Sequence, residues 1–175
     1  MLDDKTLIIE FLDGDVESFN TLILQHESLV YGMIFQVVRH KEDTEDLCQD
    51  VFVKVYFKLK RFRFESTFKT WLYRIVINSI NNYFRKQKLL TWFGQDLKEE
   101  LATKEHDNLT KKDTLYKMTN KLPNKQRNIV LLRIYQDLPF KTIGNILSIS
   151  ENSAKVSFYK AKENLKEYSK ISYAK

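Results

Sequence analysis

Apolar residues recur at helical spacing through most of this 175-residue chain, and this periodicity constrains the fold more than any other feature. Between residues 44 and 60 an apolar residue stands at every fourth position: Leu47, Val51, Val55 and Leu59. Such spacing places one apolar stripe along a helix. With 4 glycines and 2 prolines, the chain has too few turn residues for a many-stranded sandwich or barrel. The sequence therefore predicts an all-α fold.

The pattern also predicts how the helices are grouped. Helices are expected over residues 4–13, 15–38, 44–60, 68–88 and 124–135, with Gly14 separating the first two. Asp43 or Thr44 can cap the third helix, and Ser66 or Thr67 can cap the fourth. The periodicity is lost over 89–112 and resumes at Leu115. We expect two small helical domains, residues 1–92 and 113–175, joined by a linker at 93–112.

Charge is distributed in blocks. Residues 1–50 carry 3 basic and 12 acidic side chains, whereas residues 51–95 carry 10 basic and 1 acidic, and residues 123–175 carry 10 basic and 4 acidic. A basic block is typical of a surface that binds a polyanion. The acidic block would be repelled by DNA, so it is expected to face solvent or a basic protein. The alternative is that these charges only solvate helix faces.

Few residues suit catalysis or a bound cofactor. Asp43, Asp46 and Asp50 share a helix face and can in principle hold a divalent cation, but no glycine-bearing ligand loop accompanies them. The 3 histidines lack a second histidine three or four residues away, and 4 scattered glycines cannot build a phosphate-binding loop. The lone Cys48 is expected to be a buried packing thiol. We expect no metal, no cofactor and no enzymatic activity.

No segment suggests a membrane. No apolar run reaches the ~18 residues of a membrane span. The first residues, Met1-Leu2-Asp3-Asp4, are acidic and lack the basic region of a signal peptide. We expect a cytoplasmic protein without membrane insertion.

Residues 140–168 fit a helix-turn-helix motif. Gly144 in the first helix is small enough to let a second helix approach closely, and Ser150, after the turn at Ser148-Ile149, can cap that second helix. One stripe of the second helix is apolar, with Ala154, Phe158, Ala161 and Leu165. Its opposite face carries Lys155, Val156, Tyr159, Lys160 and Lys162. A recognition helix needs this apolar back and basic front to enter the major groove. The alternative is an ordinary amphipathic helical hairpin.

The stretch from Arg61 to Lys88 mixes aromatic and basic side chains. Single-stranded nucleic acid requires both, because exposed bases stack on rings at ~1–3 kcal/mol each while cations hold phosphates. Several of these rings, Trp71, Phe68 and Phe84, are better explained as core residues. The loop from Phe62 to Thr67 is harder to explain in that way.

Three motifs resemble the sigma-70 family of bacterial transcription factors. Residues Asp43–Tyr56, DTEDLCQDVFVKVY, resemble its second conserved region, and Phe68–Asn78, FKTWLYRIVIN, resemble the region that follows it and meets the promoter's −10 element. Residues Leu122–Arg127, LPNKQR, together with the helix-turn-helix, resemble region 4. Their order and short separation resemble the extracytoplasmic-function (ECF) group, which keeps only these two domains.

This resemblance implies partners and sites. The partners would be RNA polymerase core, through its β′ clamp helices and β flap, promoter DNA and a cognate anti-sigma factor that could hold the chain at the membrane. Core docking would involve Asp46, Gln49 and Asp50. The −10 element would be contacted by Phe62, Arg63, Phe64, Arg74, Asn78, Arg85 and Lys86. The −35 element would be contacted by Arg133, Lys155, Val156, Tyr159 and Lys160.

Some positions depart from the family pattern. The 62–68 loop lacks the glycine often found there, and Val156 replaces a polar residue. The promoter sequence that this chain recognises therefore cannot be transferred from relatives.

Two other functions are alternatives to this one. A stand-alone operator-binding regulator would use the same helix-turn-helix but leave the acidic block without a role. The other alternative is an enzyme that cleaves phosphodiesters, but the sequence offers no convincing carboxylate–lysine constellation for that reaction.

Overall fold

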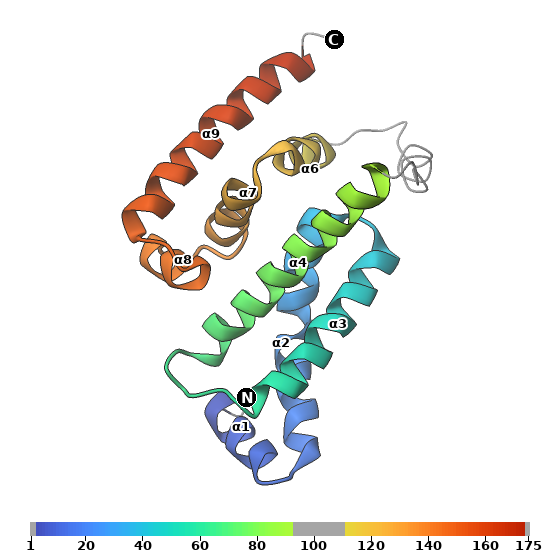
Figure 1. Ribbon diagram of the computed structural model, residues 1–175, viewed down its shortest axis with the longest axis vertical. Helices are drawn as coiled ribbons and strands as arrows, with labels where there is room; N and C mark the ends of the chain where they lie inside the picture. The colour runs from blue at the N-terminus through green and yellow to red at the C-terminus, as the bar shows by residue number, and fades with distance from the viewer. Residues whose placement is uncertain (1–2, 93–110, 174–175) are drawn as a thin grey trace.

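The computed structural model describes residues 3–92 and 111–173, and this part of the chain is helical and contains no strand. The elements are α1 (Asp4–Leu12), α2 (Val16–Val38), α3 (Lys41–Leu59), α4 (Phe68–Trp92), α6 (Lys111–Lys121), α7 (Asn124–Val130), the π-helical η1 (Leu131–Tyr135), α8 (Phe140–Leu147) and α9 (Glu151–Tyr173). Helices α1 to α4 form one bundle, and α6 to α9 form a second group beside it (Figure 1). The predicted all-α, two-domain fold is confirmed.

The N-terminal bundle buries the stripes that the sequence predicts. Leu47, Val51, Val55 and Leu59 of α3 are all buried. They pack with the buried side of α4, which includes Leu72 and Val76. Apolar burial at this spacing is what holds four amphipathic helices together. The first two helices separate at Gly14, whose φ of 109° favours glycine, and Asp15 caps α2 by accepting a hydrogen bond from the Glu17 amide at 3.0 Å.

The predicted cap of the third helix is wrong. Helix α3 begins at Lys41, and its cap is His40, whose Nδ1 accepts a 3.3 Å hydrogen bond from the Asp43 amide. Thr44 lies inside the helix, where its hydroxyl donates to the His40 carbonyl at 2.7 Å. The prediction for α4 is confirmed, because Thr67 Oγ1 accepts a hydrogen bond from the Thr70 amide at 3.2 Å.

The C-terminal group has a small apolar centre of its own. Leu122, Val130 and Ala161 are buried there, with Phe158 and Leu165 partly buried against them. The helix expected over 124–135 is instead α-helical to Val130 and π-helical from Leu131 to Tyr135. Of the predicted linker, residues 93–110 lie outside the described part of the chain, and Lys111 begins α6.

The two helical groups also pack against each other. Apolar side chains of α4 and α8, among them Val76 and Ile146, belong to one continuous buried cluster. Helix α8 therefore rests on α4, and the turn of the helix-turn-helix motif faces the N-terminal bundle.

Candidate nucleic-acid and protein interfaces

The turn between α8 and α9 has the geometry of a helix-turn-helix. Ser148 is left-handed with a φ of 56°, and the Ile149 amide donates to the Gly144 carbonyl at 2.9 Å. Ser150 caps α9 by accepting a hydrogen bond from the Ser153 amide at 3.1 Å. A Cβ built on Gly144 would lie 2.7 Å from the Ile149 carbonyl oxygen. The predicted turn, cap and small residue are therefore all present.

Helix α9 presents the basic front that its spacing predicts. Ala154 and Ala161 are fully buried, whereas Val156 is 46% and Tyr159 is 59% exposed. Lys160 is exposed, and Lys155 pairs with Glu151 at 2.7 Å. This ion pair is at the surface, so a DNA phosphate can compete for the lysine. The face has the size and charge of a recognition helix.

Arg133 has a different environment from the rest of the predicted upstream site. Its Nη1 donates to the Leu138 carbonyl at 3.0 Å and lies 3.5 Å from Asp137. Its guanidinium lies 5.2 Å from the centre of the Phe140 ring. These contacts tie η1 to the start of α8, so Arg133 holds the motif together in this conformation.

In the loop between α3 and α4, one aromatic ring is buried and the other is exposed. Phe62 is only 8% exposed, and its ring centre lies 5.2 Å from that of Trp71 and 4.9 Å from that of Phe64. Phe64 is 41% exposed, and its φ of 55° puts it in the left-handed region. Arg63 is exposed beside it. Phe62 thus belongs to the core, contrary to the expectation that this loop lies outside it, and Phe64 is its accessible ring.

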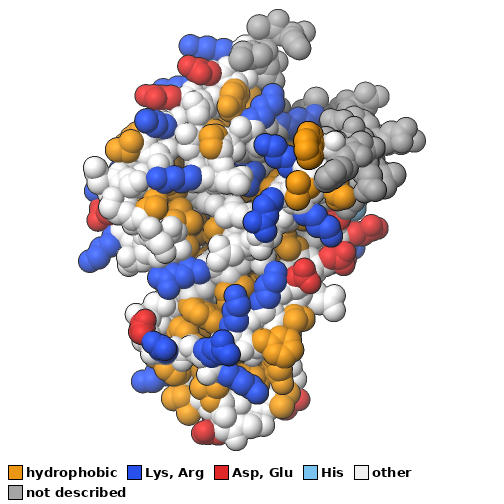
Figure 2. Space-filling view, in the orientation of Figure 1, with side chains coloured by type: hydrophobic (Ala, Val, Ile, Leu, Met, Phe, Trp, Pro, Cys, Tyr) orange, Lys and Arg blue, Asp and Glu red, His pale blue; other side chains and the backbone are white. Residues whose placement is uncertain are grey.

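Polar and basic residues follow one side of α4. Arg74 and Asn78 line a groove of about 390 Å³ that also includes residues of α7 and the α8–α9 turn. Arg85 and Lys86 are exposed farther along the helix. Lys and Arg side chains are frequent on the face of the molecule in which α4 is seen (Figure 2). The predicted cations are therefore accessible, except that Arg74 is half-buried.

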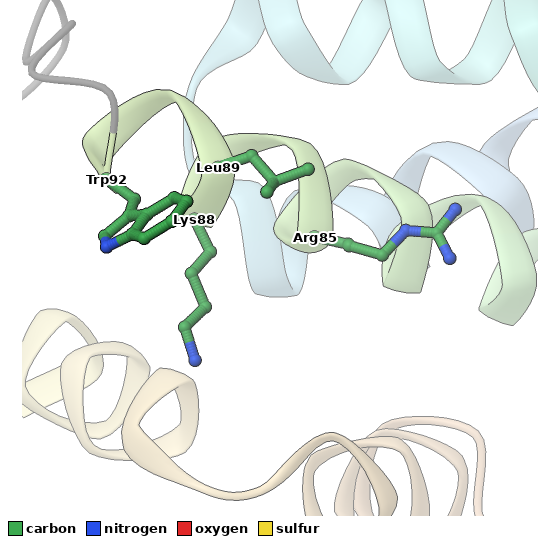
Figure 3. A pocket seen from close by; sticks show the side chains of 4 residues that line it. All are labelled: Arg85, Lys88, Leu89 and Trp92. Atoms are coloured by element: carbon green, nitrogen blue, oxygen red, sulfur yellow. The ribbon is translucent and has the colours of Figure 1, made fainter.

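At the end of α4, three residues that were not expected to be part of a site, Lys88, Leu89 and Trp92, lie beside the predicted Arg85. Arg85, Lys88, Leu89 and Trp92 line a hollow there (Figure 3). Trp92 is 81% exposed, and Leu89 is 50% exposed. Exposed ring and cation side by side suit a nucleobase and its phosphate. The helix that the periodicity predicts ends at residue 88, so the pattern gives no indication that Trp92 lies on α4 beside these cations.

The acidic residues of α3 form a second surface. Asp46, Gln49 and Asp50 are exposed and line a groove between α3 and α4. Across this groove, Tyr83 donates to Asp43 at 2.8 Å. Burial and this carboxylate raise the pKa of Tyr83, so it remains a hydrogen-bond donor.

An apolar strip lies next to the acidic surface. It consists of exposed or half-exposed side chains of α2 and α3: Ile23, Leu24, Phe52, Val53 and Phe57. Leu24 is 71% exposed and Phe57 is 70% exposed. Gln49 borders both surfaces. Adjacent exposed apolar residues with a polar rim are typical of a protein-binding surface.

The buried thiol and the buried imidazole of the N-terminal bundle make packing and hydrogen-bond contacts within it. Cys48 is buried, and burial raises the pKa of its thiol to about 11. His26 is 2.8 Å from Asp4 and packs edge-on against Phe68. Within residues 3–92 and 111–173, no three His, Cys, Asp or Glu side chains gather as metal ligands. No helix in these ranges is both long and apolar enough to cross a membrane.

Two family models match the two helical groups. The model of sigma-70 region 2 matches residues 22–89, and that of sigma-70 region 4 matches residues 112–165. Together they cover α3, α7, η1 and α8 in full and most of α2, α4, α6 and α9. The chain belongs to the sigma-70 family, in its ECF group. The family supports a non-enzymatic role in transcription initiation.

Similar proteins agree over nearly the whole length. An ECF RNA polymerase sigma-E factor of Haemophilus influenzae is 26% identical over 176 residues, covering 93% of each chain. RNA polymerase sigma factor SigV of Bacillus subtilis is 28% identical over 142 residues, covering 81% of this chain and 84% of SigV. RNA polymerase sigma-H factor of Pseudomonas aeruginosa is 25% identical over 174 residues, covering 91% and 90%.

Solved structures show the same fold. CnrH in complex with the cytosolic domain of CnrY has a TM-score of 0.68 at 20% identity, covering 96% of this chain and 97% of CnrH. The sigma factor RpoE of Bartonella quintana, in complex with the anti-sigma factor NepR, has a TM-score of 0.65 at 20% identity, covering 89% and 98%. Both proteins were solved with partners that bind them.

Proposed function

We propose that this ECF sigma factor directs core RNA polymerase to promoters through three separate surfaces of the chain. The front of α9 reads the upstream −35 duplex, with Lys155, Val156, Tyr159 and Lys160 as contacts. The observation that carries this assignment is the split of α9 into a buried alanine stripe and an exposed basic front. Arg133 ties η1 to the segment before α8 through its contacts to Asp137 and Leu138.

The −10 element is captured by the loop and by α4. Phe64 supplies the accessible ring, Arg63 a neighbouring cation, and Asn78 an amide that can bond a base edge. Phe62 supports Phe64 from the core. Arg74, Arg85 and Lys86 hold phosphates, and Lys88 and Trp92 extend the contact.

Core polymerase docks on α2 and α3. Asp46, Gln49 and Asp50 supply charge and polar contacts at the rim, and the apolar strip supplies buried area. An anti-sigma factor is expected as a further partner, because similar folds were solved with such proteins. The chain itself catalyses no reaction, and we expect it in the cytoplasm.

Transcription in vitro tests the function as a whole. Core polymerase is incubated with genomic fragments, with and without the chain, and specific transcripts are expected only when the chain is present. Specific transcription without the chain, or DNA binding by the chain that never recruits polymerase, would overturn the proposal. The second outcome would favour an operator-binding regulator.

A charge reversal tests the docking surface. Asp46→Lys with Asp50→Lys is expected to weaken binding to core polymerase by at least about tenfold at low salt, because like charges replace complementary ones. Glu163→Lys with Glu167→Lys makes the same change in charge on exposed positions of α9 and serves as the control. Equal affinity of wild type and the α3 variant would place the docking surface elsewhere.

A further inference from the structure

We propose that helix α1 and His26 position the loop that captures the −10 base, with Asp4 and His26 as positioning residues. This role rests on the function proposed for Phe64 and goes beyond it, because neither Asp4 nor His26 contacts DNA. Both act through the buried rings against which Phe64 packs. The model of sigma-70 region 2 begins at residue 22, so α1 lies outside the part of the chain that the family match covers.

His26 interrupts the apolar stripe of α2. Leu22 and Val30 lie about one turn before and after it on the same face, and both are fully buried. His26 itself is only 8% exposed. An apolar side chain would pack there without a partner, whereas a buried imidazole needs a hydrogen bond. Packing alone therefore does not account for a histidine at this position.

The partner of His26 is Asp4, in the first turn of α1. His26 Nε2 lies 2.8 Å from Asp4 Oδ1, and the imidazole donates because a carboxylate only accepts. The side chain of Asp4 is 30% exposed, so water can still reach it. Helix α1 is fixed on the bundle by its buried residues Leu7, Ile8 and Phe11. The carboxylate therefore belongs to a packed helix and sets the orientation of the imidazole ring.

Ring contacts lead from His26 to the loop between α3 and α4. The His26 ring lies edge-on to the ring of Phe68, with 5.1 Å between their centres. Phe68 is buried and lies edge-on to Phe62 at 6.3 Å, and Phe62 lies 4.9 Å from the exposed Phe64. Edge-on packing of this kind favours particular ring orientations. The start of α1 thus lies beside the loop that leads into α4, as Figure 1 shows.

The loop depends on these rings because its backbone has few other contacts. Within residues 3–92 and 111–173, no backbone hydrogen bond joins residues 63–66 to another backbone group. Phe64 has a φ of 55°, a left-handed conformation that its surroundings must hold in place. Rotation of Phe68 would move Phe62 and, with it, the accessible ring of Phe64. A loop that must be ordered during capture binds the base more weakly than one already in position.

The test uses holoenzyme assembled from core polymerase and the full chain, on a promoter identified by transcription of genomic fragments. His26→Leu completes the apolar stripe of α2, so it should keep or raise the Tm. Asp4→Ala should lower the Tm, because it leaves the imidazole buried without a partner. Both variants should bind core polymerase as wild type does. We nevertheless expect both to reduce open-complex formation in permanganate footprints by about fivefold, the scale of one hydrogen bond.

Two further variants isolate the hydrogen bond. Asp4→Asn keeps an acceptor oxygen and should recover most of the melting lost in Asp4→Ala. The double variant Asp4→Ala, His26→Leu should melt the promoter no worse than either single variant, because both changes remove the same contact.

Ser18→Ala is the matched control. Ser18 is buried and also joins α2 to α1, because its hydroxyl donates to Glu10 Oε2 at 2.6 Å. Its hydrogen bonds, to Glu10 and Asp15, involve none of the rings that lead to the loop. This variant should leave promoter melting within about twofold of wild type.

Several outcomes would overturn the proposal. They are promoter melting that follows the Tm across all variants, wild-type melting by His26→Leu, additive losses in the double variant, and Asp4→Asn melting no better than Asp4→Ala. Phe64→Ala separates this failure from failure of the proposed function. If Phe64→Ala abolishes melting and His26→Leu does not, the loop captures the base without α1. If neither variant affects melting, the function proposed for the loop is itself wrong.

Discussion

Replacing Gly144 by alanine tests the helix-turn-helix at its tightest point. The new Cβ would lie 2.7 Å from the Ile149 carbonyl oxygen and 3.4 Å from both the Ser150 carbonyl carbon and the Glu151 amide nitrogen. All three atoms are backbone, so no side chain can rotate to make room. Relief requires the turn to move away from α8, although the Ile149 amide is bonded to the Gly144 carbonyl at 2.9 Å. The start of α9 would move with it.

Two opposing effects set the magnitude. Overpacking a rigid site costs about 1–3 kcal/mol, whereas alanine is favoured over glycine inside a helix by about 1 kcal/mol. Because the contacting atoms are all backbone, the cost should fall in the upper part of that range, about 2–3 kcal/mol. We therefore expect a net loss of about 1–2 kcal/mol, and with it a fall in Tm of about 2–8 °C for a chain of this size. Gly32→Ala is the matched control, since nothing lies within 4 Å of its added Cβ in the middle of α2. That variant should gain about 0.5–1 kcal/mol.

The assay must separate the two helical groups, because they need not unfold together. Urea denaturation gives the overall change, and hydrogen exchange of α8 and α9 peptides locates it. Gly144→Ala should increase exchange in these two helices and weaken binding to upstream duplex DNA. A Gly144→Ala protein at least as stable as wild type would show that the close approach of the turn to α8 is not real.

Three further predictions concern the loop, the recognition helix and the buried thiol. Phe62→Ala should destabilise the fold by about 3–5 kcal/mol, because it removes a buried ring. Phe64→Ala should keep the Tm of the wild type but lose promoter melting in permanganate footprints, with partial rescue on a pre-melted template. Equal stability of the two variants would contradict this assignment of one buried and one accessible ring. Lys155→Ala and Lys160→Ala should each weaken binding to upstream duplex DNA. If the lysine contacts a phosphate, affinity should fall equally for all DNA sequences and the salt slope should shrink by about one. If it contacts a base, the loss should be ~1–3 kcal/mol and confined to particular promoter positions, so titrations with promoter variants distinguish the two. Burial raises the pKa of the Cys48 thiol from 9.0 to about 11, so Cys48 should react with Ellman's reagent at pH 8 only after unfolding. The stability that its protonated thiol contributes should be complete below pH 9 and lost toward pH 11, as urea titrations at these pH values will measure.

Much of this architecture is predictable from periodicity alone. The stripe from Leu47 to Leu59 is buried as expected, and so are Ala154 and Ala161 behind the front of α9. These predictions hold because each helix must bury one face whatever its neighbours are. Ser150 and Thr67 cap their helices because a hydroxyl just before a helix has few other partners.

The features that the sequence did not predict depend on contacts between residues that their spacing does not indicate. His40 caps α3 although histidine is not a preferred cap, while the better candidates, Asp43 and Thr44, lie within the helix. Phe62 and Phe64 are two residues apart in one loop, and the backbone turn at Phe64, rather than any pattern, decides which ring is buried. Burial of Arg127 requires Phe84, which is far away in the sequence.

The two helical groups pack together although both carry an excess of positive charge. The sequence that contains α4, residues 51–95, carries 10 basic and 1 acidic side chains, and residues 123–175 carry 10 basic and 4 acidic. Two basic surfaces repel each other, and DNA attracts both. The contact between the groups gives two of its cations uncharged partners, because Arg74 donates to the Asn145 carbonyl and the Arg127 guanidinium lies over the Phe84 ring. Two hydrogen bonds between uncharged groups, Tyr73 to Gln136 and Asn128 to Asn81, complete it. The groups therefore pack together despite their like charge, and the exposed cations of both stay available to a polyanion.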